Sequence, residues 1–313
     1  MQSSSTDARP LRIGTRGSKL ALAQAHAVRA ALAAAEALPL GAYEIVVLST
    51  AGDRILDRPL AEVGGKGLFT EEIEAQLLSG DLDIAVHSAK DMPTALPDGL
   101  VLAGYLPRED VRDVLIGRTA PTLAELPAGA VVGTASLRRA ALIRQIRPDL
   151  RTETFRGNVQ TRLDKLARGD VDATLLALAG LKRLGVAEVA TEILPVETML
   201  PAVGQGAIAI EARGDDAAVA RRLAPILDRA TGIALAAERA FLATLDGSCR
   251  TPIAGHATVA GGRVRFTGLV LTPDGTRSHA IEDEGPEDEA EDLGRRAGEQ
   301  LKTRAGPGFF DPA

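Results

Sequence analysis

The only cysteine of this chain, Cys249, follows a segment of helical apolar spacing and three turn-forming residues, Asp246-Gly247-Ser248. A lone thiol cannot form an internal disulfide, and its special uses are those of a nucleophile or a covalent anchor. The alternative is a small buried hydrophobe. Because the helical pattern stops before the thiol, we expect Cys249 on a loop beyond a helix end, where Arg250 favours the thiolate.

Cationic and hydroxyl side chains gather where predicted strands end and helices begin. Open parallel sheets bind ligands at such ends, where backbone N–H groups already attract anions. Taken singly, each arginine has an alternative as a solvated surface residue. Guanidinium groups bind carboxylates or phosphates in pairs of hydrogen bonds, so the cluster predicts a ligand with several anionic groups. The residues are Arg16, Ser18, Lys90, Asp91, Ser136, Arg138, Arg139, Arg156, Arg162 and Arg183.

Lys90-Asp91 is the best acid–base candidate of the chain. A carboxylate at a strand end among arginines can accept N–H bonds and stabilise a transient cation. An ordinary salt bridge is the alternative. The four histidines lack metal-ligand spacing, so no metal is expected. Gly65-Lys66 lacks the remainder of a P-loop, and Gly204–Ala209 spells a dinucleotide fingerprint without a preceding strand, so neither predicts a nucleotide.

The order of predicted elements indicates two α/β units followed by an α+β unit. Strands and helices alternate up to about residue 106, and the pattern restarts after it, which predicts mostly parallel sheets. From about residue 229 a helix, three alternating strands and a last helix predict an antiparallel sheet. The predicted strands are 11–15, 43–48, 84–86, 131–133, 152–155, 173–177, 253–260, 263–271 and 277–282, and the predicted helices are 20–32, from 70, 137–146, 158–167, 233–245 and from 286.

Composition limits the classes of partner. The net charge is −6 and aromatic residues make up only 3% of the chain, which opposes a nucleic-acid or membrane-surface partner. The polar first ten residues resemble neither a signal peptide nor an anchor, and no stretch approaches the length of a membrane span. A reducing cytoplasm is the expected compartment, and the core is expected to be aliphatic.

Eight segments, in order from residue 11 to about 256, resemble the porphobilinogen deaminase (hydroxymethylbilane synthase) family of tetrapyrrole biosynthesis. The last fifty or so residues match more loosely. The segments are Leu11–Leu22 (LRIGTRGSKLAL), Val63–Phe69 (VGGKGLF), Asp83–Pro93 (DIAVHSAKDMP), Val132–Arg139 (VGTASLRR), Arg156–Arg162 (RGNVQTR), Ala179–Arg183 (AGLKR), Leu200–Gly206 (LPAVGQG) and the segment around Cys249.

The resemblance implies a fold of two domains similar to type II periplasmic binding proteins, plus a C-terminal α+β domain with a small antiparallel sheet. It implies boundaries of 10–106 with 202–226 for domain 1, 107–201 for domain 2, and 227–313 for domain 3, which carries the cysteine loop. It also implies a dipyrromethane held through a thioether to Cys249. Four porphobilinogens are then added with loss of ammonia, and the linear tetrapyrrole is hydrolysed off. A cytoplasmic monomer is implied as well.

The resemblance also implies roles for individual residues. Loss of ammonia leaves an azafulvene cation, which Asp91 would stabilise, and Lys90 would hold carboxylates. The implied catalytic residues are Asp91, Lys90, Arg16, Arg156 and Arg162. Those implied for cofactor binding are Cys249, Ser18, Lys90, Asp91, Thr134, Ser136, Arg138, Arg139 and Arg183. Those implied for substrate binding are Arg16, Ser18, Arg156, Arg162, Arg183, Lys66 and Gln205.

One position departs from some relatives, which have a lysine where this chain has Glu62. Lys66 is therefore expected only as a loop contact, and Glu62 is left without a role. Two other function classes remain open. A binding protein or sensor could use the same cleft but would not need an accessible thiol. A nucleic-acid-binding module would explain Arg138-Arg139 but is opposed by the acidic net charge.

Overall fold

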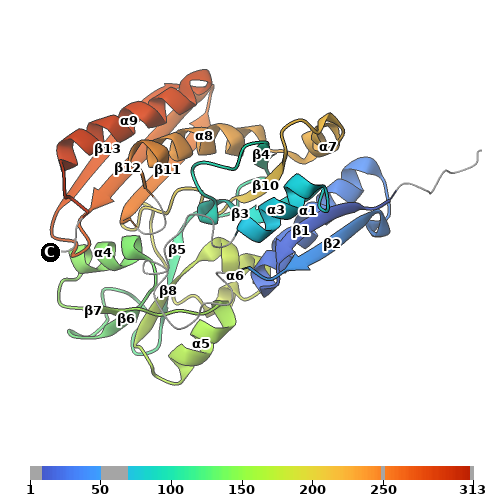
Figure 1. The fold of residues 1–313 in the computed structure, drawn as a ribbon. Coiled ribbons are helices and arrows are strands. Elements are labelled where there is room, and N and C mark those ends of the chain that lie inside the picture. The colour runs from blue at the N-terminus through green and yellow to red at the C-terminus, as the bar shows by residue number, and fades with distance from the viewer. Residues whose placement is uncertain (1–8, 51–69, 248–250, 311–313) are drawn as a thin grey trace, which may run out of the picture.

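The computed structural model describes residues 9–50, 70–247 and 251–310. Its strands form three sheets, two of five strands and one of three. Figure 1 shows the three-stranded sheet, under its two long helices, beside the two larger sheets. Within these residues no helix is long and apolar enough to cross a membrane.

The first sheet has the order β2-β1-β3-β10-β4. Its strands are β1 (Leu11–Arg16), β2 (Tyr43–Leu48), β3 (Ile84–Ser88), β4 (Leu100–Tyr105) and β10 (Ile208–Arg213). β1 is parallel to β2 and β3, whereas β10 runs antiparallel to both of its neighbours. The helices and 3₁₀ turns of this unit are α1 (Lys19–Glu36), η1 (Leu40–Ala42), α3 (Glu71–Ser79), η2 (Ala89–Asp91), α7 (Ala217–Leu223) and η4 (Ala224–Ile226).

The second sheet repeats this plan in the order β7-β6-β8-β5-β9, with β5 as its reversed strand. Its strands are β5 (Asp113–Gly117), β6 (Val131–Gly133), β7 (Arg151–Glu153), β8 (Ala173–Ala177) and β9 (Glu192–Ile193). Its helices are α4 (Leu137–Ile146), α5 (Val159–Ala167) and α6 (Leu178–Leu184), followed by the 3₁₀ turn η3 (Ala187–Val189). In each of these two five-stranded sheets only one of the described strands is reversed, which agrees with the expected mostly parallel arrangement.

The third sheet is an antiparallel meander covered by two packed helices (Figure 1). The elements are α8 (Arg229–Thr244), β11 (Ile253–Ala260), β12 (Arg263–Leu271), β13 (Ser278–Pro286), η5 (Glu287–Glu289) and α9 (Ala290–Ala305). Aliphatic residues dominate the cores of the first two units. Phe241 and Phe266 lie at the centre of the third, with ring centroids 4.9 Å apart.

Several predicted boundaries differ from the structure, and the differences in the last two sheets are the following. The strand expected at 152–155 is β7, which lies one residue earlier at its start and ends at Glu153. The third strand of the last unit continues to Pro286, because it pairs with β12 along its whole length. The final helix follows a 3₁₀ turn and begins at Ala290. Four strands (β4, β5, β9 and β10) were not predicted, and two of these are the reversed strands of the large sheets.

The chain crosses between the two large sheets twice, from β4 to β5 and from β9 back to β10. The returning segment contains Gly204, whose φ of +74° is in the left-handed region that favours glycine. A Cβ at Gly204 would lie 3.0 Å from the backbone of Ala89 and Lys90, so the crossing passes directly against the turn after β3. The absence of a strand before Gly204, which argued against dinucleotide binding, is confirmed.

Candidate active site

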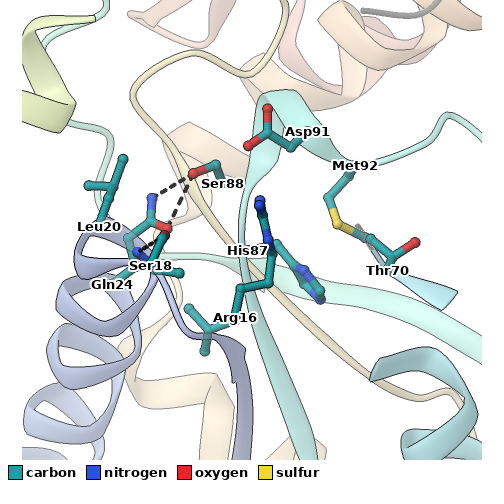
Figure 2. A pocket seen from close by; sticks show the side chains of 11 residues that line it. Arg16, Ser18, Leu20, Gln24, Thr70, His87, Ser88, Asp91 and Met92 are labelled. Carbon is teal, nitrogen blue, oxygen red and sulfur yellow. Dashed lines mark hydrogen bonds between the residues drawn. The ribbon is translucent and has the colours of Figure 1, made fainter. Parts of the chain in front are cut away.

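The parallel strands of both large sheets bring the chemistry-bearing residues to their carboxyl ends. Arg16 ends β1, and Ser18 caps α1 by accepting a hydrogen bond of 3.2 Å from the Ala21 N–H. Asp91 ends the 3₁₀ turn that follows β3. Arg16, Ser18 and Asp91 line one pocket, together with His87, Ser88 and Thr70 (Figure 2). Three of the sequence-predicted residues of the first unit therefore lie around one pocket.

The neighbouring residue Lys90 faces the second unit. Its Nζ lies 3.5 Å from Oε1 of Gln205, and the Gln205 amide donates to Asp113 Oδ1 at 2.8 Å and to the Val111 carbonyl at 2.7 Å. Burial, followed by the positive charge of Arg139, lowers the pKa of Lys90 from 10.5 to about 8. Gln205 thus joins Lys90 to the second unit through hydrogen bonds on both sides of its amide.

A buried ion triad lies under this contact. Asp113 is fully buried at the start of β5. One of its carboxylate oxygens accepts a hydrogen bond from the Arg138 guanidinium and the other from the Arg139 guanidinium, each at 2.7 Å. Burial alone would raise the pKa of Asp113, but the two guanidinium groups hold it well below its ordinary value. Ser136, as expected, caps α4 and accepts from the Arg139 N–H at 3.4 Å. Buried Thr134 accepts from the Ser136 N–H at 3.1 Å.

Arg138, which is expected to bind cofactor carboxylates, contacts protein atoms in this structure, as Arg139 does. Its side chain is 4% exposed, and its second nitrogen donates to the Leu200 carbonyl at 2.7 Å. Its terminal nitrogens are therefore engaged by protein atoms. Gln205, expected to contact substrate, is 1% exposed and is engaged in the same way. Both residues brace the site from behind.

Arg156 and Arg162 lie close enough for their positive charges to interact. Burial, followed by the charges of Arg139 and Arg156, lowers the pKa of Arg162 to about 10. Arg162 Nε donates to the Gly157 carbonyl at 2.9 Å, just before the α5 N-cap Asn158. Arg183, at the end of α6, donates to the carbonyl of Gly206 at 2.6 Å, and burial lowers its pKa.

This arrangement fits a polyanionic ligand. Lys90 and Arg162 are each destabilised in their charged forms by burial and by neighbouring cations, so incoming carboxylates would relieve both effects. Buried Nε atoms of Arg138 and Arg139 also have no hydrogen-bond partner among the described residues. A dipyrromethane bearing acetate and propionate groups has the charge that these residues require.

Three sequence-predicted features lie outside the described residues: Cys249, Lys66 and Glu62. The described neighbours of the cysteine are the end of α8 and the start of β11. They are held together at Gly247, where a Cβ would lie 2.6 Å from side-chain atoms of Leu242 and Ile253. In the described ranges, no group of three or more His, Cys, Asp or Glu residues could hold a metal ion.

Sequence reasoning missed Asp113, Glu211 and Glu238, which are all fully buried carboxylates. Asp113 is the first residue of the short apolar strand DVLIG. Glu211 lies inside the short apolar strand IAIEAR. A charged residue in a buried strand is the signal that could have identified them, because such a charge requires a partner. Their ionisable partners lie 25 to 130 residues away in the sequence and could not be deduced from it.

Comparisons with known proteins identify the family of this chain. Residues 11–221 match the family model described as "Porphobilinogen deaminase, dipyromethane cofactor binding domain", and residues 233–303 match "Porphobilinogen deaminase, C-terminal domain". A porphobilinogen deaminase of Nitrobacter hamburgensis is 56% identical over 298 residues, which cover 95% of this chain and 94% of the relative.

Solved structures with a similar overall arrangement are more distant. A putative methionine-binding lipoprotein of Bacillus subtilis aligns with a TM-score of 0.45 and 11% identity over 71% of this chain and 92% of that one. A periplasmic binding protein of Salmonella typhimurium with high arginine specificity aligns with a TM-score of 0.41 and 14% identity, over 72% and 94% of the two chains.

The two family models together span most of the chain, and the relative matches it nearly from end to end. This chain belongs to the porphobilinogen deaminase family. The resemblance seen in the sequence is thereby confirmed, as are the class of enzyme, a transferase of tetrapyrrole synthesis, and the dipyrromethane cofactor.

Proposed function

We propose that this chain carries its dipyrromethane on Cys249 and uses the cleft between the two large sheets to condense four porphobilinogen molecules head to tail. Ammonia leaves at each addition, and the linear tetrapyrrole hydroxymethylbilane is released by hydrolysis. The observation that carries this proposal is the placement of Asp91, Arg16 and Ser18 in one pocket, with Lys90 beside it facing the Asp113 triad. The bound dipyrromethane supplies the primer from which the product chain is built.

We assign the binding of the primer to residues near Lys90, where the first two units meet. Lys90 brings a positive charge to the place where the units meet, close to Arg139, and carboxylates bound there would stabilise its charged form. Ser18, Thr134, Ser136, Asp91 and Arg183 complete the set expected from the sequence. Arg138 and Gln205 hold Asp113 and Lys90 in place, which we assign to them instead of direct contact with pyrrole carboxylates.

We assign substrate binding to arginines of both units and the chemistry to Asp91 in the pocket. Every porphobilinogen brings an acetate and a propionate, for which Arg16, Arg156, Arg162 and Arg183 supply guanidinium groups, with Lys66 as a further contact. Asp91 is exposed at the pocket and keeps a carboxylate available. It would accept pyrrole N–H bonds and stabilise the cation formed when ammonia leaves, because the opposite charge lowers the energy of that state.

The division into domains supports the same mechanism. We propose 10–106 with 202–226, 107–201 and 227–313 as three domains, which agrees with one sheet in each. A small number of crossing segments then join domains 1 and 2, so the cleft can adjust as the product grows. We further propose that the enzyme works as a cytoplasmic monomer.

Intact-protein mass spectrometry with peptide mapping tests the proposal. The purified protein should carry the mass of two linked pyrrole units on the peptide containing Cys249, and should release ammonia from porphobilinogen. Cys249→Ser should lack the added mass and the activity. Unmodified native protein that binds porphobilinogen reversibly without releasing ammonia would instead support the binding-protein alternative.

A further inference from the structure

A buried cluster of three titratable side chains lies behind the wall of the Asp91 pocket. His87 lines the pocket (Figure 2), and its Nε2 lies 3.0 Å from Oε2 of Glu211. The Glu211 side chain is fully buried and the His87 side chain is 5% exposed. Glu74 of α3 is close enough for its titration to respond to both. The three side chains come from β3, β10 and α3.

The two carboxyl groups of this cluster differ in their surroundings. Burial raises the pKa of Glu74, and the negative charge of Glu211 raises it further, whereas His87 and a hydrogen bond with Thr70 act in the opposite direction. One carboxyl oxygen of each glutamate has no hydrogen-bond partner among the described residues.

A buried carboxylate on a central strand is costly for folding. Glu211 occupies the middle of β10, between Ile210 and Ala212, and pairs with β3 and β4 on its two sides. Apolar side chains of similar size commonly serve as well or better at such positions. The position of His87, three residues before Lys90 and four before Asp91, places the cluster directly behind the reacting groups. The unfavourable burial of Glu211 therefore occurs next to the pocket, where this carboxylate can influence His87.

We propose that Glu211 is a positioning residue for the condensation reaction. It accepts the Nε2–H of His87, which fixes the imidazole in one tautomer and one orientation at the pocket wall. A hydrogen bond from one ring nitrogen sets which nitrogen carries the proton, as in catalytic sites where a carboxylate orients a histidine. The inference rests on the proposed function of the Asp91 pocket.

Two substitutions of the same type separate the carboxylates. Glu211→Gln replaces the charged acceptor by a neutral amide, which can donate to the imidazole as well as accept from it and so no longer selects one tautomer. It should lower kcat by about ten- to a hundredfold, as expected when a group beside the chemistry is displaced, with KM for porphobilinogen changed less. Glu74→Gln mimics a protonated acid and should leave kcat within about twofold. Equal losses of kcat in both variants, or none in Glu211→Gln, would overturn the proposal.

The tautomer provides a readout that does not depend on activity. Nitrogen-15 NMR of the native holoenzyme should show the His87 proton on Nε2, and Glu211→Gln should weaken that preference while Glu74→Gln preserves it. A native enzyme with the proton only on Nδ1 contradicts the proposal even if the Glu211 variant does not fold. If the native enzyme shows the Nε2–H tautomer but does not consume porphobilinogen, the proposed function fails and the geometric part of the inference stands.

Discussion

Arg108 and Glu238 form a buried ion pair that joins the crossing between the large sheets to the third unit. The two terminal nitrogens of Arg108 lie 2.6 and 3.1 Å from the two oxygens of Glu238, a residue of α8. Glu238 also accepts hydrogen bonds from the backbone N–H groups of Gly204 and Ala257, at 2.7 and 2.8 Å. One carboxylate therefore holds the returning segment, the cysteine-bearing unit and the first crossing together.

Arg108→Met should lower the free energy of unfolding by about 3–5 kcal/mol, because it leaves the fully buried charge of Glu238 without its counterion. Urea denaturation measures this. The matched control is Arg265→Met, since the Arg265 side chain is 72% exposed and 3.4 Å from Glu284. It should change the stability by no more than about 0.5 kcal/mol. Similar losses in the two variants would show that the network does not join the units energetically.

Asp113→Asn should destabilise the protein strongly at pH 7, because Arg138 and Arg139 would lose their shared counterion in a buried place. The folded-state pKa of Asp113 is depressed below its ordinary 3.8, so its contribution is complete above that pH and is lost as the pH falls further. The difference in free energy of unfolding between native and variant should accordingly shrink below about pH 3.8. A difference that is independent of pH would contradict the ionised triad.

Lys90→Gln should abolish most activity and yet stabilise the protein when no primer is bound. In the fold the Lys90 pKa is lowered from 10.5 to about 8, so the charged lysine opposes folding fully below pH 8. In a Cys249→Ser background, the variant should melt about 2 °C or more above its parent at pH 7. This advantage should disappear as the pH rises from about 8 towards 10.5. A Lys90 variant less stable than its parent would show that the charge is already compensated.

Asp91→Asn should lower kcat by about two to three orders of magnitude, because the amide cannot stabilise a cation at the pocket as a carboxylate does. The control is Asp98→Asn, an exposed residue on the segment between η2 and β4. Peptide mass mapping should still find the two pyrrole units on Cys249 in both variants. Unchanged kcat in Asp91→Asn would remove this residue from the chemistry.

Local pattern was sufficient for most elements of this chain. Tyr43–Leu48, Leu137–Ile146 and Ile253–Ala260 were predicted with the bounds that the structure shows, because alternation or helical spacing coincides there with clear turn and capping residues. The reversed strands were missed. β10 contains Glu211, and β5 begins with Asp113. A segment with a charged residue is predicted to be exposed unless the buried partner of that charge is known.

The sequence by itself determined the family, the alternation of strands and helices, and the collection of cations at strand ends, since each depends on residues that are near one another in the chain. Tertiary structure alone decided what each of these cations contacts. Arg138 and Arg139 are adjacent in sequence and share Asp113, but only the fold shows that Arg138 also binds the Leu200 carbonyl, 62 residues away. Long-range pairing of buried charges depends on how the sheets pack, and local spacing carries no record of that packing.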